Sequence, residues 1–372
     1  MQICTAQLIA KVFILTIKSN LQSKLHNIYK QREIKNHYLQ YIFLEITKRC
    51  NLNCLHCGSD CKKEIESAEL TTESWFKIID YLKNKFSESI AFIITGGEPL
   101  LHSDVYKIGS YIHQNGMRWG MVTNGLMLNS ENLNKLCDSG ISSITLSLDG
   151  LEDSHNWLRN NQFSFKNTLE ALKLIAQSEI IHKDIVSCVS PKNLVELGRI
   201  GELLIENRIK NWRLFRIFPS GRANINEQLK LSFSQTKELL EWIKINKPYY
   251  QKKGLNINLS CEGWVPFEED KKLRDYPFFC RSGINIASIL SDGTITGCSN
   301  NSKGFYVGNI LQDNFGDLWE NHFDIFRTKK WLDRTVCADC KHIKSCKGSS
   351  IHLWDFGDYK PKFCYEVDMD KI

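Results

Sequence analysis

Three cysteines in one short loop constrain this chain more than any other feature of its sequence. Cys50, Cys54 and Cys57 follow directly on the apolar, β-branched run Tyr41–Ile46. Three thiolates at the spacing C-x3-C-x2-C can hold three irons of a cubane cluster, and the fourth iron then stays open to a ligand. The spacing alone leaves two alternatives open: a zinc site, or a fully ligated cluster in which Cys61 is the fourth ligand.

The remaining cysteines bear on the cellular compartment. The chain has 14 cysteines, and its most apolar N-terminal stretch, Leu8–Ile17, is too short to span a bilayer and lacks a signal-peptide cleavage site. We therefore expect a cytoplasmic protein with reduced thiols, in which clustered cysteines bind metal. Three isolated cysteines are expected to pack in the core as small hydrophobic residues: Cys4, Cys137 and Cys188.

Between residue 41 and about residue 245, short apolar runs alternate with stretches of helical periodicity. The runs predict six strands: Tyr41–Ile46, Ile90–Thr95, Trp119–Thr123, Ser143–Leu148, Ile185–Val189 and Trp212–Phe218. Predicted helices begin after Thr71/Thr72, at Asn129/Ser130 and at Asn193, where Glu196 completes a capping-box spacing. Successive βα units predict an α/β fold with a parallel sheet, either open or wound into a partial barrel, and functional groups at the C-terminal ends of the strands.

The texture of the sequence divides the chain into three parts. Residues 1–39 are basic and predict one or two helices that cap the main domain, or alternatively a partner-docking arm; residues 40–248 hold the βα units. Residues 249–372 are rich in Gly, Asn, Asp and Cys, so we expect them to bury little core of their own and to need metal as a cross-link. The net charge of +6 is too small to indicate nucleic-acid binding.

Four further segments lie at or just after the ends of the predicted strands. They are Gly96-Gly97-Glu98-Pro99, Val122-Thr123-Asn124-Gly125, Ser147-Leu148-Asp149-Gly150 and His155-Asn156-Trp157-Leu158-Arg159. Together with the three-cysteine loop, they resemble the motifs of the radical S-adenosylmethionine (radical SAM) enzymes. That resemblance implies a partial (β/α)6 barrel and a [4Fe-4S] cluster on Cys50, Cys54 and Cys57 whose open iron binds SAM.

The resemblance also implies which residues bind SAM. Glu98 corresponds to the residue that binds the SAM amino group, and Arg159 to the one that pairs with its carboxylate, although Asn156 stands where the family usually has Asp. His56 takes the place of an aromatic residue beside the adenine, and Arg222 is either a ligand contact or a surface residue. The other implied SAM contacts are Gly96, Gly97, Pro99, Thr123, Asn124, Ser147 and Asp149.

The cysteine-rich tail is similar to the SPASM extension of this family. The resemblance implies an outer auxiliary [4Fe-4S] cluster on Cys337, Cys340, Cys346 and Cys364, with a structural zinc on the same four residues as the alternative. The family pattern has one more cysteine at the position of Ser350. An inner auxiliary cluster would therefore use Cys280 and Cys298, with Cys261 as a possible recruit and one iron open, or it would be absent.

The resemblance further implies the reaction. An electron from the first cluster, supplied by a donor such as flavodoxin or ferredoxin, cleaves SAM, and the 5′-deoxyadenosyl radical takes a hydrogen atom from the substrate, so no catalytic protein base is expected. Relatives with the tail mostly modify peptides or proteins, and oxidative modification of a peptide or protein is the favoured hypothesis. The alternatives are a radical SAM enzyme for a small molecule or cofactor precursor, and a non-catalytic iron–sulfur or zinc scaffold.

Overall fold

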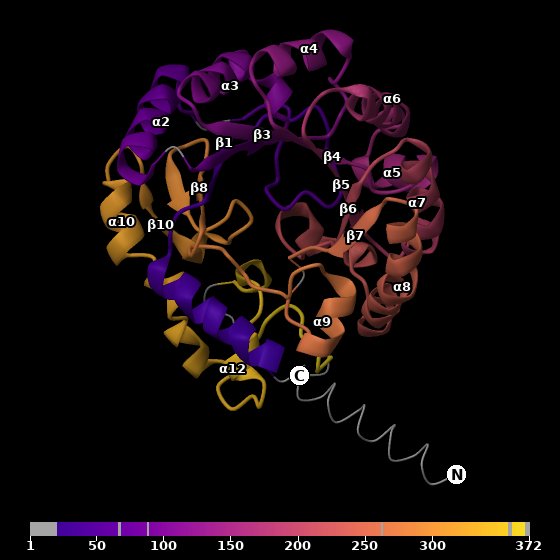
Figure 1. Cartoon of the computed structure of the whole chain (residues 1–372), viewed down its shortest axis with the longest axis vertical. Coiled ribbons are helices and arrows are strands. Elements are labelled where there is room, and N and C mark those ends of the chain that lie inside the picture. Colours follow the sequence, from indigo (N-terminus) through magenta and orange to yellow (C-terminus); the bar gives the residue numbers. More distant parts are fainter. Residues whose placement is uncertain (1–20, 66–67, 88, 262, 356–358, 369–372) are drawn as a thin grey trace.

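The computed structural model describes residues 21–65, 68–87, 89–261, 263–355 and 359–368, which build one curved sheet with helices on its outer side (Figure 1). The sheet has ten strands in the order β10-β9-β8-β1-β2-β3-β4-β5-β6-β7. The strands are β1 (Tyr41–Thr47), β2 (Ala91–Gly96), β3 (Arg118–Thr123), β4 (Ser143–Ser147), β5 (His182–Val189), β6 (Asn211–Arg216), β7 (Asn256–Leu259), β8 (Ile286–Ile289), β9 (Thr294–Thr296) and β10 (Tyr306–Asn309).

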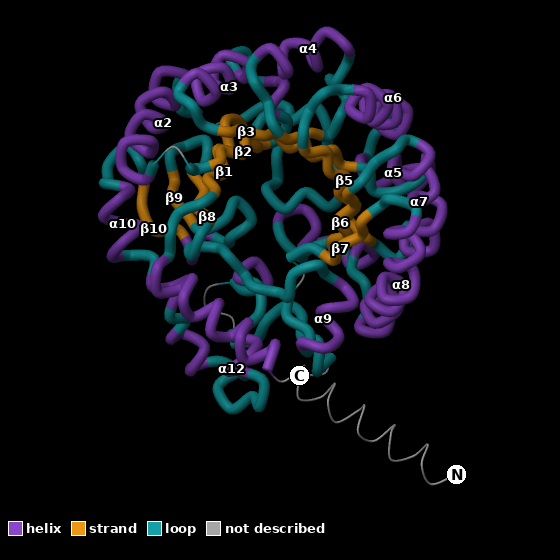
Figure 2. The backbone as a smooth tube through the Cα atoms, in the orientation of Figure 1, coloured by secondary structure: helices purple, strands orange, loops and turns teal. Residues whose placement is uncertain are grey.

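Strands β1 to β7 run parallel, as the alternation of strand and helix predicts. They form an arc inside a ring of helices (Figure 2), so the predicted partial barrel is confirmed. All six predicted strands are present as β1 to β6. β5 begins at His182 rather than Ile185, and β6 ends at Arg216 rather than Phe218, which are ordinary differences at strand ends.

The helices that follow the strands cover the outer face of the sheet (Figure 1). Two predicted N-caps are confirmed: the Thr71 hydroxyl accepts from the Ser74 N–H at 3.2 Å, and the Asn129 side chain accepts from the Asn132 N–H at 2.8 Å. The helices on this face are α2 (Thr72–Phe86), α3 (Val105–Gln114), α4 (Ser130–Asp138), α5 (Glu152–Arg159), α6 (Ser164–Gln177), α7 (Leu197–Glu206) and α8 (Phe233–Lys252).

The capping box predicted at Asn193 is wrong. A short 3-10 helix, Leu194–Glu196, precedes α7, and neither side chain caps it. The Asn193 amide instead donates to the carbonyls of Asp149 and Cys188, and the Glu196 carboxylate accepts from the Leu151 N–H at 3.0 Å. These polar groups therefore hold the loop after β4, because that loop packs beside the start of α7 and offers its backbone groups.

The tail extends both edges of the sheet. α8 continues through Pro248 to Lys252, and β7 then pairs with β6, while β8 pairs in parallel with β1 at the opposite edge. β9 and β10 follow as antiparallel strands. The division of the chain at residue 248 stays a prediction, but residues on both sides of it belong to the same sheet.

The expectation that the tail buries little core is wrong. Its helices are α9 (Phe267–Leu273), α10 (Phe315–Asn321), α11 (Asp324–Arg327) and α12 (Ile343–Cys346), and a cluster of aromatic rings lies on and between α10 and α11. Trp319 packs on Phe323 with ring centroids 4.8 Å apart, and Phe323 packs on Phe326 at 5.4 Å. All three side chains are buried. Large aromatic side chains bury much surface per residue, so the tail forms a core from few apolar positions.

The described part of the N-terminal arm packs on this tail. Residues 21–36 form a helix. The Lys30 ammonium group donates to the Ser345 carbonyl at 3.2 Å, and the Arg281 guanidinium donates to the Tyr29 hydroxyl at 2.8 Å. The rest of the predicted arm, including Cys4, lies outside the described residues. No helix among the described residues is both long enough and apolar enough to cross a membrane.

The core position expected for Cys137 is wrong. Cys137 was expected on the buried face of its helix with Leu133 and Leu136; those two leucines are buried, but Cys137 is exposed. The reason is geometric, since the contact face of the short helix α4 passes through the leucines and Cys137 lies beside it.

The end of β2 packs directly on the loop after β1. The Gly97 N–H donates to the Thr47 carbonyl at 2.8 Å, and the Glu98 N–H donates to the Arg49 carbonyl at 2.9 Å. A Cβ on Gly97 would lie 2.2 Å from the Arg49 carbonyl oxygen, and Gly96 has a φ of 149°. The two glycines thus allow the backbone to approach the segment that leads into Cys50.

We expect Gly97→Ala to lower the free energy of unfolding by about 1–3 kcal/mol, the usual cost of overpacking. Chemical denaturation of the metal-free chain measures this. Gly198→Ala in α7 is the matched control, because its Cβ would meet no atom within 4 Å; that change is expected to be neutral or to stabilise by up to about 1 kcal/mol. Equal stability of the two variants would contradict the packing described here.

Candidate functional site

A cavity of about 300 Å³ lies at the C-terminal ends of the parallel strands. Its size is at the lower end of the range typical of small-molecule sites, about 300–1,000 Å³. Residues from five strand ends and from the cysteine loop line it, and Glu98 and Asp149 are fully buried close by. The predicted residues in the lining are Cys50, Cys54, His56, Cys57, Gly96, Gly97, Thr123, Asn124, Ser147 and Arg159.

The three cysteines of the loop face this cavity together with Cys61. Burial raises the pKa of the Cys50 thiol to about 11 and also raises that of Cys54. The hydrogen bond from the Cys61 thiol lowers the pKa of Cys57, and the Cys61 N–H also donates to Cys57 Sγ at 3.4 Å. Thiols gathered in this way fit a soft metal such as iron in a cluster, or zinc. The position of Cys61 keeps its role as a fourth ligand open.

Arg222, which follows β6, forms hydrogen bonds with the backbone of the cysteine loop. It lies in a 3-10 helix, Gly221–Ile225. Its Nε donates to the Cys54 carbonyl at 2.8 Å, its Nη1 donates to the Cys61 carbonyl and to Asp60 at 2.8 Å, and its backbone N–H donates to the Cys57 carbonyl at 3.0 Å. All of these contacts are with the loop. A direct contact of Arg222 with a ligand stays a prediction.

The Glu98 carboxylate is oriented by three donors. The Thr123 hydroxyl and the Asn124 N–H each donate to it at 2.8 Å, and the Leu100 N–H donates at 3.3 Å. Burial raises the pKa of Glu98 to about 7, because the charged form loses water. A cationic ligand beside it would favour the charged form again. Pro99 is buried in the 3-10 turn that begins directly after Glu98.

Asn124 connects this carboxylate to the cysteine loop. Its side-chain amide donates to the Asn51 side chain at 2.8 Å and points to Cys50 Sγ at 3.9 Å. The end of β3 therefore contacts both the loop and Glu98, as expected for residues at neighbouring strand ends.

Asp149 and Arg159 form a buried ion pair, with 2.6 Å between the carboxylate oxygen and Arg159 Nε. Burial alone would raise the pKa of Asp149, but the Arg159 guanidinium and His56 hold it below its usual range. Arg159 Nη1 also lies 3.8 Å from Cys54 Sγ. His56 Nε2 lies 3.8 Å from Asp149, and burial lowers the pKa of His56 to about 4. Arg159 thus lines the cavity while it is paired with a protein carboxylate.

Asn156, which stands where the family motif usually has Asp, has a structural role in this chain. Its amide donates to the Gln162 carbonyl at 2.9 Å and accepts from the Phe165 N–H at 2.8 Å. An ionised Asp could only accept. The amide therefore joins the end of α5 to the start of α6 and needs no ligand.

Cys188 is one site residue that the sequence interpretation missed. It was expected in the core, but it lies at the end of β5 and lines the cavity. Its thiol lies within 4.8 Å of the ligand atoms of His56 and Asp149, and its N–H donates to the Asp149 carboxylate at 2.9 Å. The signal that could have found it is its position at the C-terminal end of a predicted strand.

Four cysteines of the tail line a second, small cavity together with Trp264 and His342: Cys337, Cys340, Cys346 and Cys364. Burial raises the pKa of Cys346 to about 12. These are the four residues predicted for the outer auxiliary cluster, and their convergence fits either a cubane cluster or a tetrahedral zinc. The choice between these two stays a prediction.

The three remaining predicted ligands are not gathered in the same way. Cys280 lines a different cavity, beside residues 21–36. Burial and the nearby Cys280 thiol raise the pKa of Cys298. Cys261 is exposed, and among the described residues it lines neither cavity of the tail. Ser350 is fully buried, and its hydroxyl donates to the Cys261 carbonyl at 2.8 Å.

Comparisons with known proteins agree with this geometry. The sequence model of the radical SAM superfamily matches residues 44–204, and that of the SPASM iron-sulfur cluster-binding domain matches residues 280–341. The chain is 26% identical to an AdoMet-dependent heme synthase of Methanosarcina barkeri, over 85% of the chain and 92% of the relative. It is 27% identical to the mycofactocin maturase MftC of Mycolicibacterium smegmatis, over 82% of the chain and 76% of the relative.

Solved structures share the fold. The structure of native anSMEcpe with bound AdoMet and Cp18Cys peptide superposes with a TM-score of 0.68 at 17% identity, over 90% of this chain and 95% of that one. At this level of identity, the likeness concerns the fold alone.

We expect Arg222→Met to loosen the cysteine loop. Hydrogen bonds that involve a charged group contribute about 1.5–3 kcal/mol each, so amide hydrogen exchange of residues 50–62 in the metal-free chain should accelerate by roughly tenfold or more. Arg222→Lys should restore part of the protection. Arg199→Met, on the exposed face of α7, is the matched control; if it accelerated exchange in the loop equally, the proposed anchoring would be wrong.

Proposed function

Because this chain belongs to the radical SAM superfamily and carries a SPASM iron–sulfur cluster-binding domain, we propose that it oxidatively modifies a peptide or protein after reductive cleavage of SAM. The [4Fe-4S] cluster that starts this reaction is assigned to Cys50, Cys54 and Cys57. An auxiliary cluster is assigned to Cys337, Cys340, Cys346 and Cys364, where it would take up the electron that the oxidised substrate gives up.

One observation carries the proposal. The three loop cysteines and the motif residues at the ends of β2, β3 and β4, together with Arg159, line a single cavity, although they are spread over more than a hundred residues of sequence. A zinc knuckle would need only the loop. The additional polar residues around the same cavity support a small ligand that binds beside the metal.

The residues of the chain then have distinct tasks. Glu98, held by three donors, would bind the SAM ammonium group through a charge-assisted hydrogen bond. Arg159 would attract the SAM carboxylate while Asp149 keeps its guanidinium in place. His56, neutral at physiological pH, would pack against the adenine. When bound, the cluster supplies the electron that splits SAM into methionine and the 5′-deoxyadenosyl radical; the protein holds the reacting atoms close together and excludes water.

A groove beside the SAM cavity supports a peptide substrate. It has a volume of about 800 Å³ and shares Arg216, Ile217 and Phe218 with the SAM cavity. Its other wall comes from the tail and includes Tyr359, Pro361 and Phe363. A groove that is apolar in part, lined by both halves of the chain and continuous with the radical site suits an extended peptide. The similarity to a maturase points in the same direction.

A second candidate follows from a relative that matches over slightly more of the chain. The chain is about as similar to an AdoMet-dependent heme synthase, at 26% identity, as to the maturase. The groove also carries Arg216, Lys230, Lys360 and Lys362, and cationic side chains suit a porphyrin with several carboxylates. A small-molecule substrate of this class is therefore the alternative.

Two further proposals concern the surroundings of the enzyme. The reducing electron would come from a small redox protein such as a flavodoxin or ferredoxin. A reducing cytoplasm is the compartment in which exposed thiols such as Cys137 and Cys261 persist.

The test of the function uses anaerobically reconstituted full-length protein with SAM and dithionite. Replacement of Cys50, Cys54 and Cys57 by Ala should abolish 5′-deoxyadenosine formation. Replacement of Cys337 and Cys340 by Ala should spare this cleavage more than it spares product formation. A wild-type protein that binds iron but forms no 5′-deoxyadenosine would overturn the proposal in favour of a non-catalytic scaffold.

The substrate class is tested with peptides encoded beside the gene and, in parallel, with iron-coproporphyrin III. A peptide that loses mass in multiples of two hydrogens and raises 5′-deoxyadenosine formation supports the first candidate. A mass change of the porphyrin alone would instead establish the second.

We expect Glu98→Gln to weaken SAM binding by about 10- to 100-fold, since a hydrogen bond to a charged group contributes about 1.5–3 kcal/mol. The pH dependence gives a sharper readout. The pKa of Glu98 is raised to about 7; an ammonium ligand binds the charged carboxylate, so wild-type affinity should fall as the pH drops from about 7.5 to about 5.5.

The same titration separates Glu98 from the histidines of the site. The pKa values of His56 and His155 are lowered to about 4 and about 3 by burial, so neither group titrates in that window. Isothermal titration of the reconstituted protein should therefore show a flat profile for Glu98→Gln. An unchanged slope in this variant would show that Glu98 does not meet the ammonium group.

A further inference from the structure

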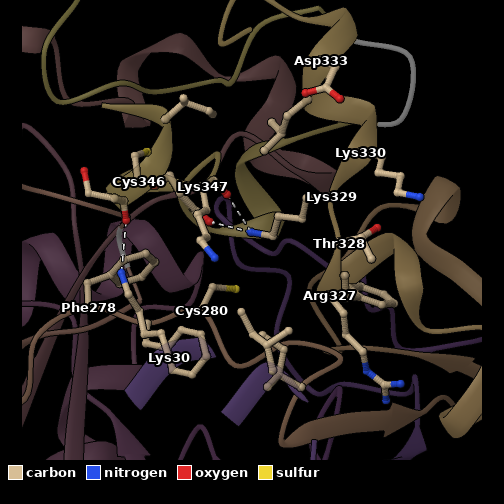
Figure 3. Close-up of a pocket in the computed structure, with 18 residues that line it drawn as sticks. Lys30, Phe278, Cys280, Arg327, Thr328, Lys329, Lys330, Asp333, Cys346 and Lys347 are labelled. Atoms are coloured by element: carbon tan, nitrogen blue, oxygen red, sulfur yellow. Dashed lines mark hydrogen bonds between the residues drawn. The ribbon is translucent and has the colours of Figure 1, made fainter. Parts of the chain in front are cut away.

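A cavity of about 230 Å³ lies between the helix of residues 21–36 and the tail (Figure 3). Its lining combines thiols with cations: Cys280 and Cys346 on one hand, and Lys30, Lys329 and Lys347 on the other. Figure 3 shows the side chains of Lys329 and Lys347 directed toward the space above the Cys280 thiol. This is the region where the sequence predicts an inner auxiliary cluster, because Cys280 is one of its two clearest ligands.

The Lys329 ammonium group is fixed in this cavity. It donates to the Lys347 carbonyl at 3.0 Å and to the Ser349 carbonyl at 3.2 Å. Burial lowers the pKa of Lys329, while the neighbouring thiols of Cys280 and Cys346 act in the opposite direction. The ammonium group therefore lies between a predicted inner ligand, an outer ligand and the backbone just before Ser350.

The loop that Lys329 binds has an unusual backbone. Lys347, Gly348 and Ser349 have φ values of 49°, 70° and 62°, and Lys329 itself has a φ of 50°. Left-handed conformations are unfavourable for residues other than glycine, so such a run needs contacts that hold it. The Lys329 ammonium supplies two of them, and the Trp354 indole N–H, which donates to the Gly348 carbonyl at 2.7 Å, supplies a third.

The four positions predicted for the inner cluster do not fit a cubane. Ser350 replaces one thiol, and its hydroxyl is directed to the Cys261 carbonyl. Cys261 is exposed, and its backbone carbonyl rather than its thiol meets Ser350, so Cys280 and Cys298 are the two clearest inner thiols among the described residues. A charged ammonium has three donors and no lone pair, so Lys329 cannot ligate iron. A cluster bound to Cys280 would share this cavity with the hydrogen-bonded Lys329 ammonium group.

We propose that this chain carries no inner auxiliary cluster and that the Lys329 ammonium group takes its place as the cross-link between the segment after α11 and the loop of residues 347–349. The proposal rests on the proposed function, because it assumes one cluster at Cys50, Cys54 and Cys57 and one at the four outer cysteines. The enzyme then has a single auxiliary cluster, and substrate oxidation has a single route for its electron through the tail.

The iron and acid-labile sulfide content of anaerobically reconstituted full-length protein tests this directly. Since each cube holds four irons, the wild type should contain about eight irons per chain. The double variant Cys280→Ser/Cys298→Ser should keep about eight, whereas Cys337→Ser/Cys340→Ser should lose about four. About twelve irons in the wild type, or a loss of about four in the Cys280/Cys298 variant, would overturn the proposal.

A second pair of variants tests the cross-link itself. Lys329→Met should lower the melting temperature by several degrees and leave the iron content unchanged. Lys330→Met, at the adjacent exposed position, should change neither quantity. A change in iron content with Lys329→Met, or no effect on melting, would contradict the assigned role. SAM cleavage is measured in the same samples, so a failure of the proposed function is seen separately from a failure of this inference.

Discussion

The backbone of the cysteine loop is the part of this structure on which the rest depends. Groups from other elements form hydrogen bonds with it near its start and along its length. The end of β2 donates two backbone hydrogen bonds to the carbonyls of Thr47 and Arg49. Arg222 donates to the carbonyls of Cys54, Cys57 and Cys61. A loop that must present several thiols to one metal site loses much conformational entropy when it is ordered. These contacts order it before the metal binds, so the metal meets a site that is largely preformed.

The same contacts position the predicted SAM-binding residue Glu98 relative to the cysteine loop. Gly96 and Gly97 let β2 approach the loop so closely that Glu98 follows directly, and Asn124 touches the loop and donates to Glu98 with its N–H. The carboxylate that would bind the SAM ammonium is thus placed relative to the thiols through main-chain hydrogen bonds, which leave less freedom than a contact between two long side chains. The space that a Cβ would need on either glycine is taken by a backbone carbonyl, of Thr47 for Gly96 and of Arg49 for Gly97.

Much of this could be predicted from the sequence, because its signals are local. The strands and the helices α2 and α4 follow from apolar periodicity and capping residues, and functional groups gather at the C-terminal ends of parallel strands by the geometry of the fold. The motif residues from Cys50 to Arg159 lie at or just after such ends. The convergence of Cys337, Cys340, Cys346 and Cys364 likewise follows from a spacing that the resemblance to SPASM domains explains.

Several of the features that were missed depend on partners far away in the sequence. Asn193 and Glu196 have the spacing of a capping box, yet their side chains form hydrogen bonds with backbone groups of Asp149, Cys188 and Leu151 instead. Arg222, Cys188 and Lys329 acquire their roles from the cysteine loop, from Asp149 and from the loop at residues 347–349, more than a dozen residues away in each case. The aromatic core of the tail was missed because its residues come from several short elements without a periodic pattern.

The central claim is that the cluster at Cys50, Cys54 and Cys57 leaves one iron free for SAM. Mössbauer spectroscopy of the ⁵⁷Fe-loaded chain, carried out in the Cys337→Ser/Cys340→Ser background to remove the auxiliary signal, tests it most directly. The account predicts that addition of SAM produces one distinct iron site of higher coordination among four. A spectrum that SAM leaves unchanged, and that changes instead when Cys61 is replaced by Ala, would show that a fourth thiolate closes the cluster and would contradict the account.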